Sequence, residues 1–249
     1  MCTVTWWRAP AGGGYEVFFS RDELRARGQA TPPVLAESRG LAYLAPSDAD
    51  HGGTWLLVNA RGVTLGLVNH YPPAAAVPAQ PRLSRGQLLR DLAGAPDLAA
   101  VAKQLAAAPL NRCPGFFLVA FGIDESPRRW RWDTRVLHDE SELEPWPFLT
   151  ASSFRGAEIA AHRREVFVRD WAGRGRLTPA DLAQFHLHRE PARPAWGVLM
   201  DRPDARTVSL SHLAIHPGRE AIFTYAERPP ADGTPPGPPT ITRLPLQGN

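Results

Sequence analysis

The chain has 249 residues, of which 43% are hydrophobic and 21% charged, a composition typical of one or two globular domains and not of a disordered segment. Its formal net charge is only +3, and its arginines are interleaved with acidic residues, so we expect a mixed solvated surface and no nucleic-acid partner. No run reaches the roughly 20 apolar residues of a membrane span, and the start lacks the pattern of a secretory signal, so we expect a cytoplasmic protein without a span.

The first part of the chain predicts two β-hairpins. Residues 3–9 and 15–19 are rich in β-forming side chains, and a Pro/Gly-rich turn at 10–14 separates them. Residues 55–59 and 63–69 form a second pair of this kind around a short turn. Two prolines directly after the second pair stop it, because proline cannot donate to a β-ladder.

The rest of the chain alternates helices with strands. After an Ala/Pro-rich loop at 73–82, Ser84 and Asp97 are predicted N-caps of two helices that extend to about residues 93 and 107. A second helix pair is predicted by helical spacing at 156–171 and by Pro179 in a first turn. Apolar or β-branched runs predict strands at 116–123, 130–137, 148–153, 196–200, 207–215 and 221–225.

This order of elements predicts an α+β fold. Strand blocks separated by helix pairs indicate two antiparallel sheets with helices on their outer faces, a four-layer αββα sandwich. No linker or change of composition divides the chain, so we expect a single domain over residues 1–249. Its Pro/Gly-rich C-terminal tail, residues 229–249, is expected to be mostly loop or disordered.

Cys2 is the residue that carries a specific chemistry. Removal of Met1, which a small second residue favours, would leave Cys2 with a free α-amine and a thiol. The amine has an ordinary pKa of about 7.7–8.0 and can take a proton, and the thiol, with a pKa of about 8.5, is a strong nucleophile. One residue would then supply both the nucleophile and the general base.

The first hairpin brings charged residues towards Cys2. A turn centred near Gly12 places Cys2 opposite Asp22, to within about two residues. Arg21 would then favour the thiolate, and Asp22 would accept hydrogen bonds from the α-amine. Asn69, at the end of the second hairpin, fits the donor of an oxyanion hole, a contribution of roughly 3–4 kcal/mol in hydrolases.

Several short motifs resemble one family. They are Met1-Cys2, Ser20-Arg21-Asp22-Glu23, Gly53-Thr54-Trp55-Leu56, Val68-Asn69 and Ser84-Arg85-Gly86. As a set they resemble the NRDE family, also called the transport and Golgi organisation 2 family, and the resemblance covers about residues 1–225. That family is similar to N-terminal-nucleophile (Ntn) hydrolases, especially the group of bile-salt hydrolases and penicillin acylases.

The resemblance implies the αββα fold and hydrolysis of a non-peptide C–N amide bond in a small amide or acyl substrate. It implies Cys2 as nucleophile, with Arg21, Asp22 and Asn69 as the other catalytic residues. We expect substrate contacts from His70, Trp6 and Ser152, and no cofactor or metal ion. The chain departs from the family where Ser20 replaces an Asn, and where residues 151–153 read Ala-Ser-Ser in place of a segment with an Asn.

Other functions remain open. The eukaryotic branch of the family is linked to haem movement and lipid homeostasis, which implies a non-catalytic carrier of haem or lipid that uses the same pocket. No haem-attachment motif accompanies Cys2 or the histidines. A scaffold protein in which Cys2 has no role is a third reading, with Arg21-Asp22-Glu23 as a solvated strand end and Asn69 as a turn cap.

The remaining cysteine and a histidine pair are expected to be structural. Two cysteines are too few for a disulfide framework, and Cys113 is predicted to be a half-buried structural thiol. His186 and His188 form a His-x-His pattern without the further ligands that a metal site needs, so we predict that they lie at the surface or its boundary.

Overall fold

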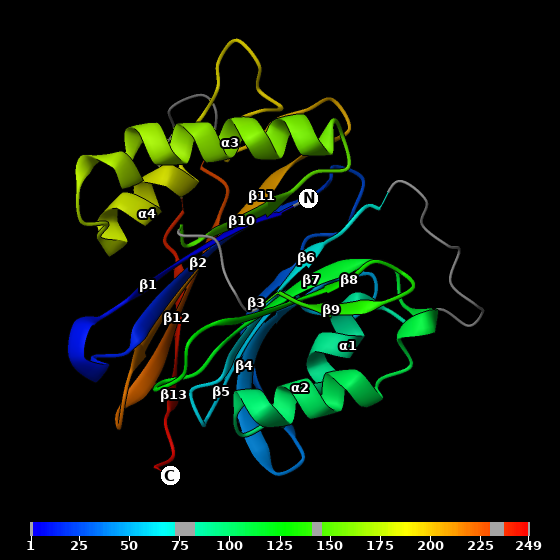
Figure 1. The fold of residues 1–249 in the computed structure, drawn as a ribbon, viewed down its shortest axis with the longest axis vertical. Coiled ribbons are helices and arrows are strands. Elements are labelled where there is room, and N and C mark those ends of the chain that lie inside the picture. Colours follow the sequence, from blue (N-terminus) through cyan, green and yellow to red (C-terminus); the bar gives the residue numbers. More distant parts are fainter. Residues whose placement is uncertain (1, 73–82, 141–145, 230–236, 249) are drawn as a thin grey trace.

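The structure, a computed structural model, describes residues 2–72, 83–140, 146–229 and 237–248. Two antiparallel sheets face each other, and helices cover the outer face of each, as Figure 1 shows. This arrangement is the predicted four-layer αββα sandwich. The segments at 73–82 and 230–236, predicted to be loops, lie outside the described residues.

The first sheet carries the N-terminal hairpin at its centre. Its strands lie in the order β10 (Phe148–Ala151), β1 (Cys2–Arg8), β2 (Tyr15–Leu24), β11 (Ala205–His216), β12 (Glu220–Glu227) and β13 (Thr240–Pro245). Two helices cover it, α3 (Gly156–Asp170) and α4 (Pro179–His186) (Figure 1). Phe18, Phe167 and Phe185 lie together in the apolar layer beneath these helices.

The second sheet is a meander. Its strands follow the chain in the order β3 (Thr31–Ser38), β4 (Leu41–Ser47), β5 (Leu56–Asn59), β6 (Thr64–Asn69), β7 (Phe116–Phe121), β8 (Arg128–Trp132) and β9 (Leu137–Asp139). The helices α1 (Arg85–Asp91) and α2 (Leu98–Ala107) pack on its outer face (Figure 1). Asp97 caps α2 as predicted, because its side chain accepts a hydrogen bond from the Ala100 amide (2.7 Å).

A third apolar layer fills the space between the sheets. Alternate residues of β1 face it, among them Val4 and Trp6, and they meet Phe121 and Phe223 from the other strands. Tyr15 places its hydroxyl in this layer and donates to the carbonyl of Gly62 (2.7 Å), which ties the first sheet to the second. The layer fixes the distance between the two sheets.

The register of β1 with its neighbours places the start of the chain. Cys2 lies opposite Arg21 of β2 and opposite Ala151 of β10. Asp22 lies one residue further along β2 and pairs with Thr207 of β11. The predicted pairing of Cys2 with Asp22 was therefore one residue off, within the margin given for it.

Several element predictions were wrong or incomplete. The strands β3, β4, β9 and β13 were not predicted, although β13 lies within the expected loop-like tail, and the strand predicted at 130–137 is β8 and ends at Trp132. Residues 196–200 form turns and not a strand. They read as a strand because Val198 and Met200 are completely buried, and a loop that fills a core is as apolar as a strand.

Two side-chain predictions were also wrong. Cys113 is only 1% exposed, so it is fully buried, and burial raises the pKa of its thiol to about 11. His186, the last residue of α4, is 3% exposed, and its ring nitrogens form hydrogen bonds with Thr5 Oγ1 (3.0 Å) and Ser20 Oγ (2.6 Å). Burial lowers the pKa of His186 to about 3, so the ring is neutral at physiological pH.

No described helix is long and apolar enough to cross a membrane. Within the described ranges, no group of three or more His, Cys, Asp or Glu side chains is arranged to hold a metal ion.

The first hairpin turn supplies a stability test. Gly14 has a φ of +92°, and a Cβ there would lie 2.0 Å from the Ile215 carbonyl of β11. Gly12 also has a positive φ, +75°, but a Cβ there would meet nothing within 4 Å. We expect Gly14→Ala to lower the free energy of unfolding by about 1–3 kcal/mol more than Gly12→Ala, measured by urea denaturation. Equal losses would contradict this tight contact.

Candidate functional site

A cavity of about 540 Å³ lies where the ends of the two predicted hairpins meet. Cys2, Arg21, Asp22 and Asn69 all line it, although they come from β1, β2 and β6. Strands β1 and β6 belong to different sheets and contact each other. The cavity thus lies at the ends of inner strands of both sheets.

Arg21 is held rigidly in the cavity wall. Its guanidinium donates to Asp48 Oδ2 (2.5 Å) and Glu23 Oε2 (3.3 Å), and its centre lies 4.1 Å from the ring centroid of Trp55. Asp48 also accepts two hydrogen bonds from Arg27, at 2.9 and 3.0 Å. Burial opposes ionisation of Asp48, but the bond from Arg27 and the two arginine charges hold the pKa of its carboxyl below its usual range.

Burial dominates the ionisation of the Cys2 thiol. The residue is 7% exposed, and burial raises the pKa of the thiol by more than the charges of the chain's N-terminus and of Arg21 lower it. The charge of Asp22 raises it further. Arg21 favours the thiolate, as expected, but two carboxylates offset its charge and removal of the sulfur from water outweighs it.

Asp22 has one engaged and one open carboxylate oxygen. Oδ1 accepts a hydrogen bond from Thr207 Oγ1 (2.6 Å). Oδ2 is buried and has no hydrogen-bond partner among the described residues, and it lies 3.9 Å from Nη1 of Arg163. A buried carboxylate oxygen is costly without a donor, so this oxygen is a ready acceptor for an amine beside it.

Arg163 was not predicted as part of the site. It lies on the buried face of α3, and its side chain is 1% exposed. Its guanidinium donates to the hydroxyls of Thr3 (3.1 Å) and Thr150 (3.0 Å) and to the Gly197 carbonyl (2.6 Å). The signal in the sequence was an arginine at helical spacing within an otherwise apolar face, since an arginine buried there requires partners.

Two glycines hold the far wall of the cavity together. A Cβ on Gly86 would lie 2.8 Å from Gly53 Cα, and a Cβ on Gly53 would lie 2.9 Å from Gly86 Cα. The Thr54 amide donates to the Gly86 carbonyl (3.2 Å). The start of α1 therefore packs backbone to backbone on the loop that leads to Trp55, which explains the glycines of two of the quoted motifs.

The three predicted substrate contacts do not line this cavity. Trp6 packs against Phe121, with ring centroids 5.5 Å apart, in the layer between the sheets. The Ser152 hydroxyl is used in a turn, where it donates to the Phe154 carbonyl (2.7 Å). His70 is half-buried and tilts against the ring of Phe117, 4.7 Å away. These three roles remain predictions without support at the cavity.

Comparison with known proteins gives the family. The model of the family described as Transport and Golgi organisation 2 matches residues 1–153. The chain belongs to this family. A search of curated proteins finds no match.

The fold of this family member is that of Ntn hydrolases. The chain is similar to penicillin V acylase from Agrobacterium tumefaciens, with a TM-score of 0.60 at 12% identity, covering 98% of this chain and 86% of that one. A C2A mutant of conjugated bile acid hydrolase from Clostridium perfringens gives 0.55 at 13% identity, with 99% and 92% covered. A Caenorhabditis elegans orthologue of N-acylethanolamine-hydrolysing acid amidase gives 0.56 at 12% identity, with 86% and 92% covered.

The buried pair of Asp22 and Arg163 can be tested by a double-mutant cycle. Arg163→Leu leaves the Asp22 carboxylate buried without a counter-charge, so we expect a loss of about 3–5 kcal/mol in the free energy of unfolding. Adding Asp22→Asn removes that charge and should recover part of the loss. Strictly additive effects in urea denaturation would show that the two side chains are not coupled.

Proposed function

We propose that this protein is an N-terminal-cysteine amidohydrolase that cleaves a non-peptide C–N amide bond in a small molecule. The observation that carries the proposal is that Cys2, Arg21, Asp22 and Asn69, distant in the sequence, line one cavity. The shared fold with penicillin V acylase and the other Ntn hydrolases supports it. Fold alone does not assign an activity, so the proposal rests on the residues that line the cavity.

The proposed reaction begins at the sulfur of Cys2, once Met1 has been removed. Sγ attacks the substrate carbonyl carbon while the α-amine of the same residue takes the thiol proton. The C–N bond then breaks, and the leaving amine takes that proton, which leaves a thioester on Cys2. Water attacks the thioester, the acid departs, and the thiol is restored.

The raised pKa of the thiol fits this order of events. A neutral resting thiol needs a base during the attack, and an α-amine with an ordinary pKa of about 7.7–8.0 is suited to that role near neutral pH. The open Oδ2 of Asp22 would accept a hydrogen bond from this amine and fix its direction. Asp22 would thus orient the base and take no proton itself.

Asn69 is the proposed donor to the oxyanion. Its Nδ2 donates to the Tyr71 hydroxyl at 3.0 Å, and the second N–H of the same amide would be the donor to the oxyanion. Arg21 would act chiefly through its fixed position in the wall, because Asp48 and Glu23 already offset its charge. A neutral donor aimed at a developing negative charge is worth roughly 3–4 kcal/mol in comparable hydrolases.

Covalent labelling tests the nucleophile. Intact mass should show that Met1 is absent, and a β-lactone probe should acylate Cys2 in the wild type. We expect Asp22→Ala to slow labelling by on the order of 10²-fold, since the base loses its orientation. Cys113→Ala is the matched control and should label normally. Retained Met1, or unchanged labelling in Asp22→Ala, would contradict the mechanism; tight haem or acyl-lipid binding without turnover would favour the carrier.

The pH dependence of alkylation separates acidity from catalysis. Because burial and Asp22 raise the thiol pKa, the midpoint of Cys2 alkylation by iodoacetamide should lie at higher pH in the folded protein than in an unfolded peptide that begins with the same cysteine and carries the same α-amine. Asp22→Asn removes one cause of the rise, so the midpoint should move to lower pH while hydrolysis slows. Peptide mass spectrometry resolves Cys2 from Cys113. A midpoint that moves to higher pH in Asp22→Asn would contradict the claim that the charge of Asp22 raises the thiol pKa.

A further inference from the structure

Most of the charges around the cavity are already balanced. Arg21 pairs with Asp48 and Glu23, at 2.5 and 3.3 Å. Arg27 pairs with Asp48 at 2.9 Å and lies 3.7 Å from Glu23. These two cations are therefore neutralised by the protein itself, and neither has a strong reason to bind a negatively charged ligand.

Arg85 differs from the other cations in the cavity. It lies at the start of α1 and lines the same cavity as Cys2. Its Nη1 donates to the Gly115 carbonyl (3.0 Å), and among the described residues no carboxylate forms an ion pair with it. The neighbouring segment 73–82 contains no acidic residue. Most of the five N–H donors of this guanidinium are thus left for a ligand.

The backbone holds Arg85 in place at the cavity, and its charge is poorly solvated there. The backbone contact of Gly86 with Gly53 fixes the start of α1 against the cavity wall. Arg85 is half-buried, and this burial lowers its pKa by more than the charge of Glu23 raises it, which reflects the cost of taking part of a cation out of water. An anion delivered by a ligand would remove that cost.

Resting on the proposed amidase function, we infer that Arg85 selects amide substrates that carry a carboxylate, which it binds through its free guanidinium donors in the cavity of Cys2. A planar guanidinium matches a carboxylate with two parallel hydrogen bonds, so the interaction is directional as well as electrostatic. Arg85 is thereby a specificity-determining residue. It takes no part in the bond-making step.

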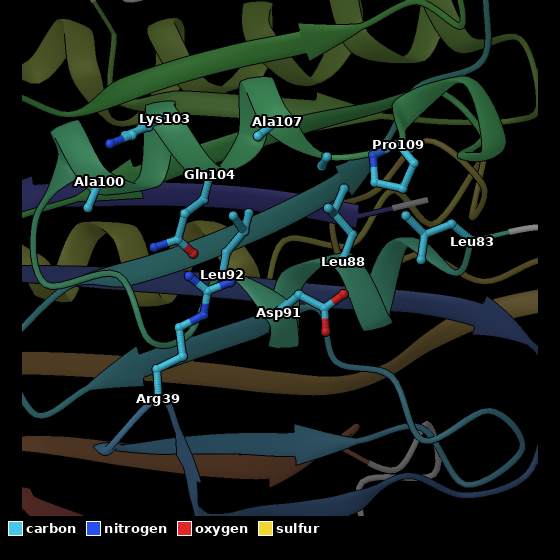
Figure 2. A pocket seen from close by; sticks show the side chains of 11 residues that line it. Arg39, Leu83, Leu88, Asp91, Leu92, Ala100, Lys103, Gln104, Ala107 and Pro109 are labelled. Atoms are coloured by element: carbon cyan, nitrogen blue, oxygen red, sulfur yellow. The ribbon is translucent and has the colours of Figure 1, made fainter.

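Arg39, which lines a different groove, provides a matched control for Arg85. A groove of about 590 Å³ lies between α1 and α2, lined by Leu88, Leu92 and Gln104 with Arg39 and Lys103 at its edge. Figure 2 shows Arg39 extending from the β3–β4 turn towards Leu92 and Gln104. Cys2 does not line this groove. Arg39→Gln therefore removes an exposed arginine without touching the cavity of Cys2.

The kinetic test compares a charged and a neutral substrate of similar size, N-octanoylglycine and N-octanoylethanolamine. In Arg85→Gln we expect kcat/KM for N-octanoylglycine to fall by about 10–100-fold, and that for the ethanolamide to stay within about twofold. Arg85→Lys should retain part of the preference, and Arg39→Gln all of it. A monoamide of glutaric acid, whose amine part carries no charge, tests whether Arg85 also selects substrates with a carboxylate on the acyl part. Equal losses on charged and neutral substrates, or no loss at all, would overturn the inference.

A binding measurement keeps this inference separate from the proposed chemistry. Titration calorimetry of Cys2→Ala with N-octanoylglycine should show binding that weakens about 10–100-fold in Cys2→Ala/Arg85→Gln. Binding of this kind with no turnover in the wild type would refute the amidase and leave the role of Arg85 intact. Equal affinity in the two variants would refute the role of Arg85 whether or not the wild type is active.

Discussion

The site depends on a carboxylate that is buried near the end of an inner strand and balanced by a charge from the helical layer outside the sheet. Asp22 is at the end of β2, yet its counter-charge, Arg163, comes from α3 on the outer face. Thr207 on the neighbouring strand holds one of its oxygens. The cost of burying this charge is offset only while α3, β2 and β11 keep their relative positions. The electrostatics of the cavity therefore require the whole of this half of the sandwich.

A second constraint comes from the pairing of β1 on both sides. Cys2 is held between Arg21 of β2 and Ala151 of β10, so the beginning of the chain is a central strand and not a loose end. The Thr3 and Thr150 hydroxyls bond each other (2.8 Å) and both accept from Arg163. Thr150 Oγ1 also donates to the Cys2 carbonyl (3.2 Å), so the backbone of Cys2 and the counter-charge of Asp22 belong to one hydrogen-bond network.

Local signals in the sequence predicted much of this architecture. Alternation and a Pro/Gly turn gave the first hairpin, and from it the proximity of Cys2, Arg21 and Asp22. What could not be predicted was set by distant partners. The strands β3 and β4 lack clear alternation, and Arg163, His186 and Arg85 have roles that depend on where α3, α4 and α1 dock. The burial of Cys2, which raises the pKa of its thiol, could not be predicted for the same reason, since burial is a property of the whole fold.

The contact between Gly53 and Gly86 limits how this cavity can change shape. Where a helix rests on side chains, those side chains can take new rotamers and let the helix slide. Here main chain touches main chain, so no rotamer change can relieve a displacement of α1. The cavity can therefore be fitted to larger or smaller molecules only by substitutions of the side chains around this contact. This contact therefore fixes the distance between the loop before β5 and the start of α1.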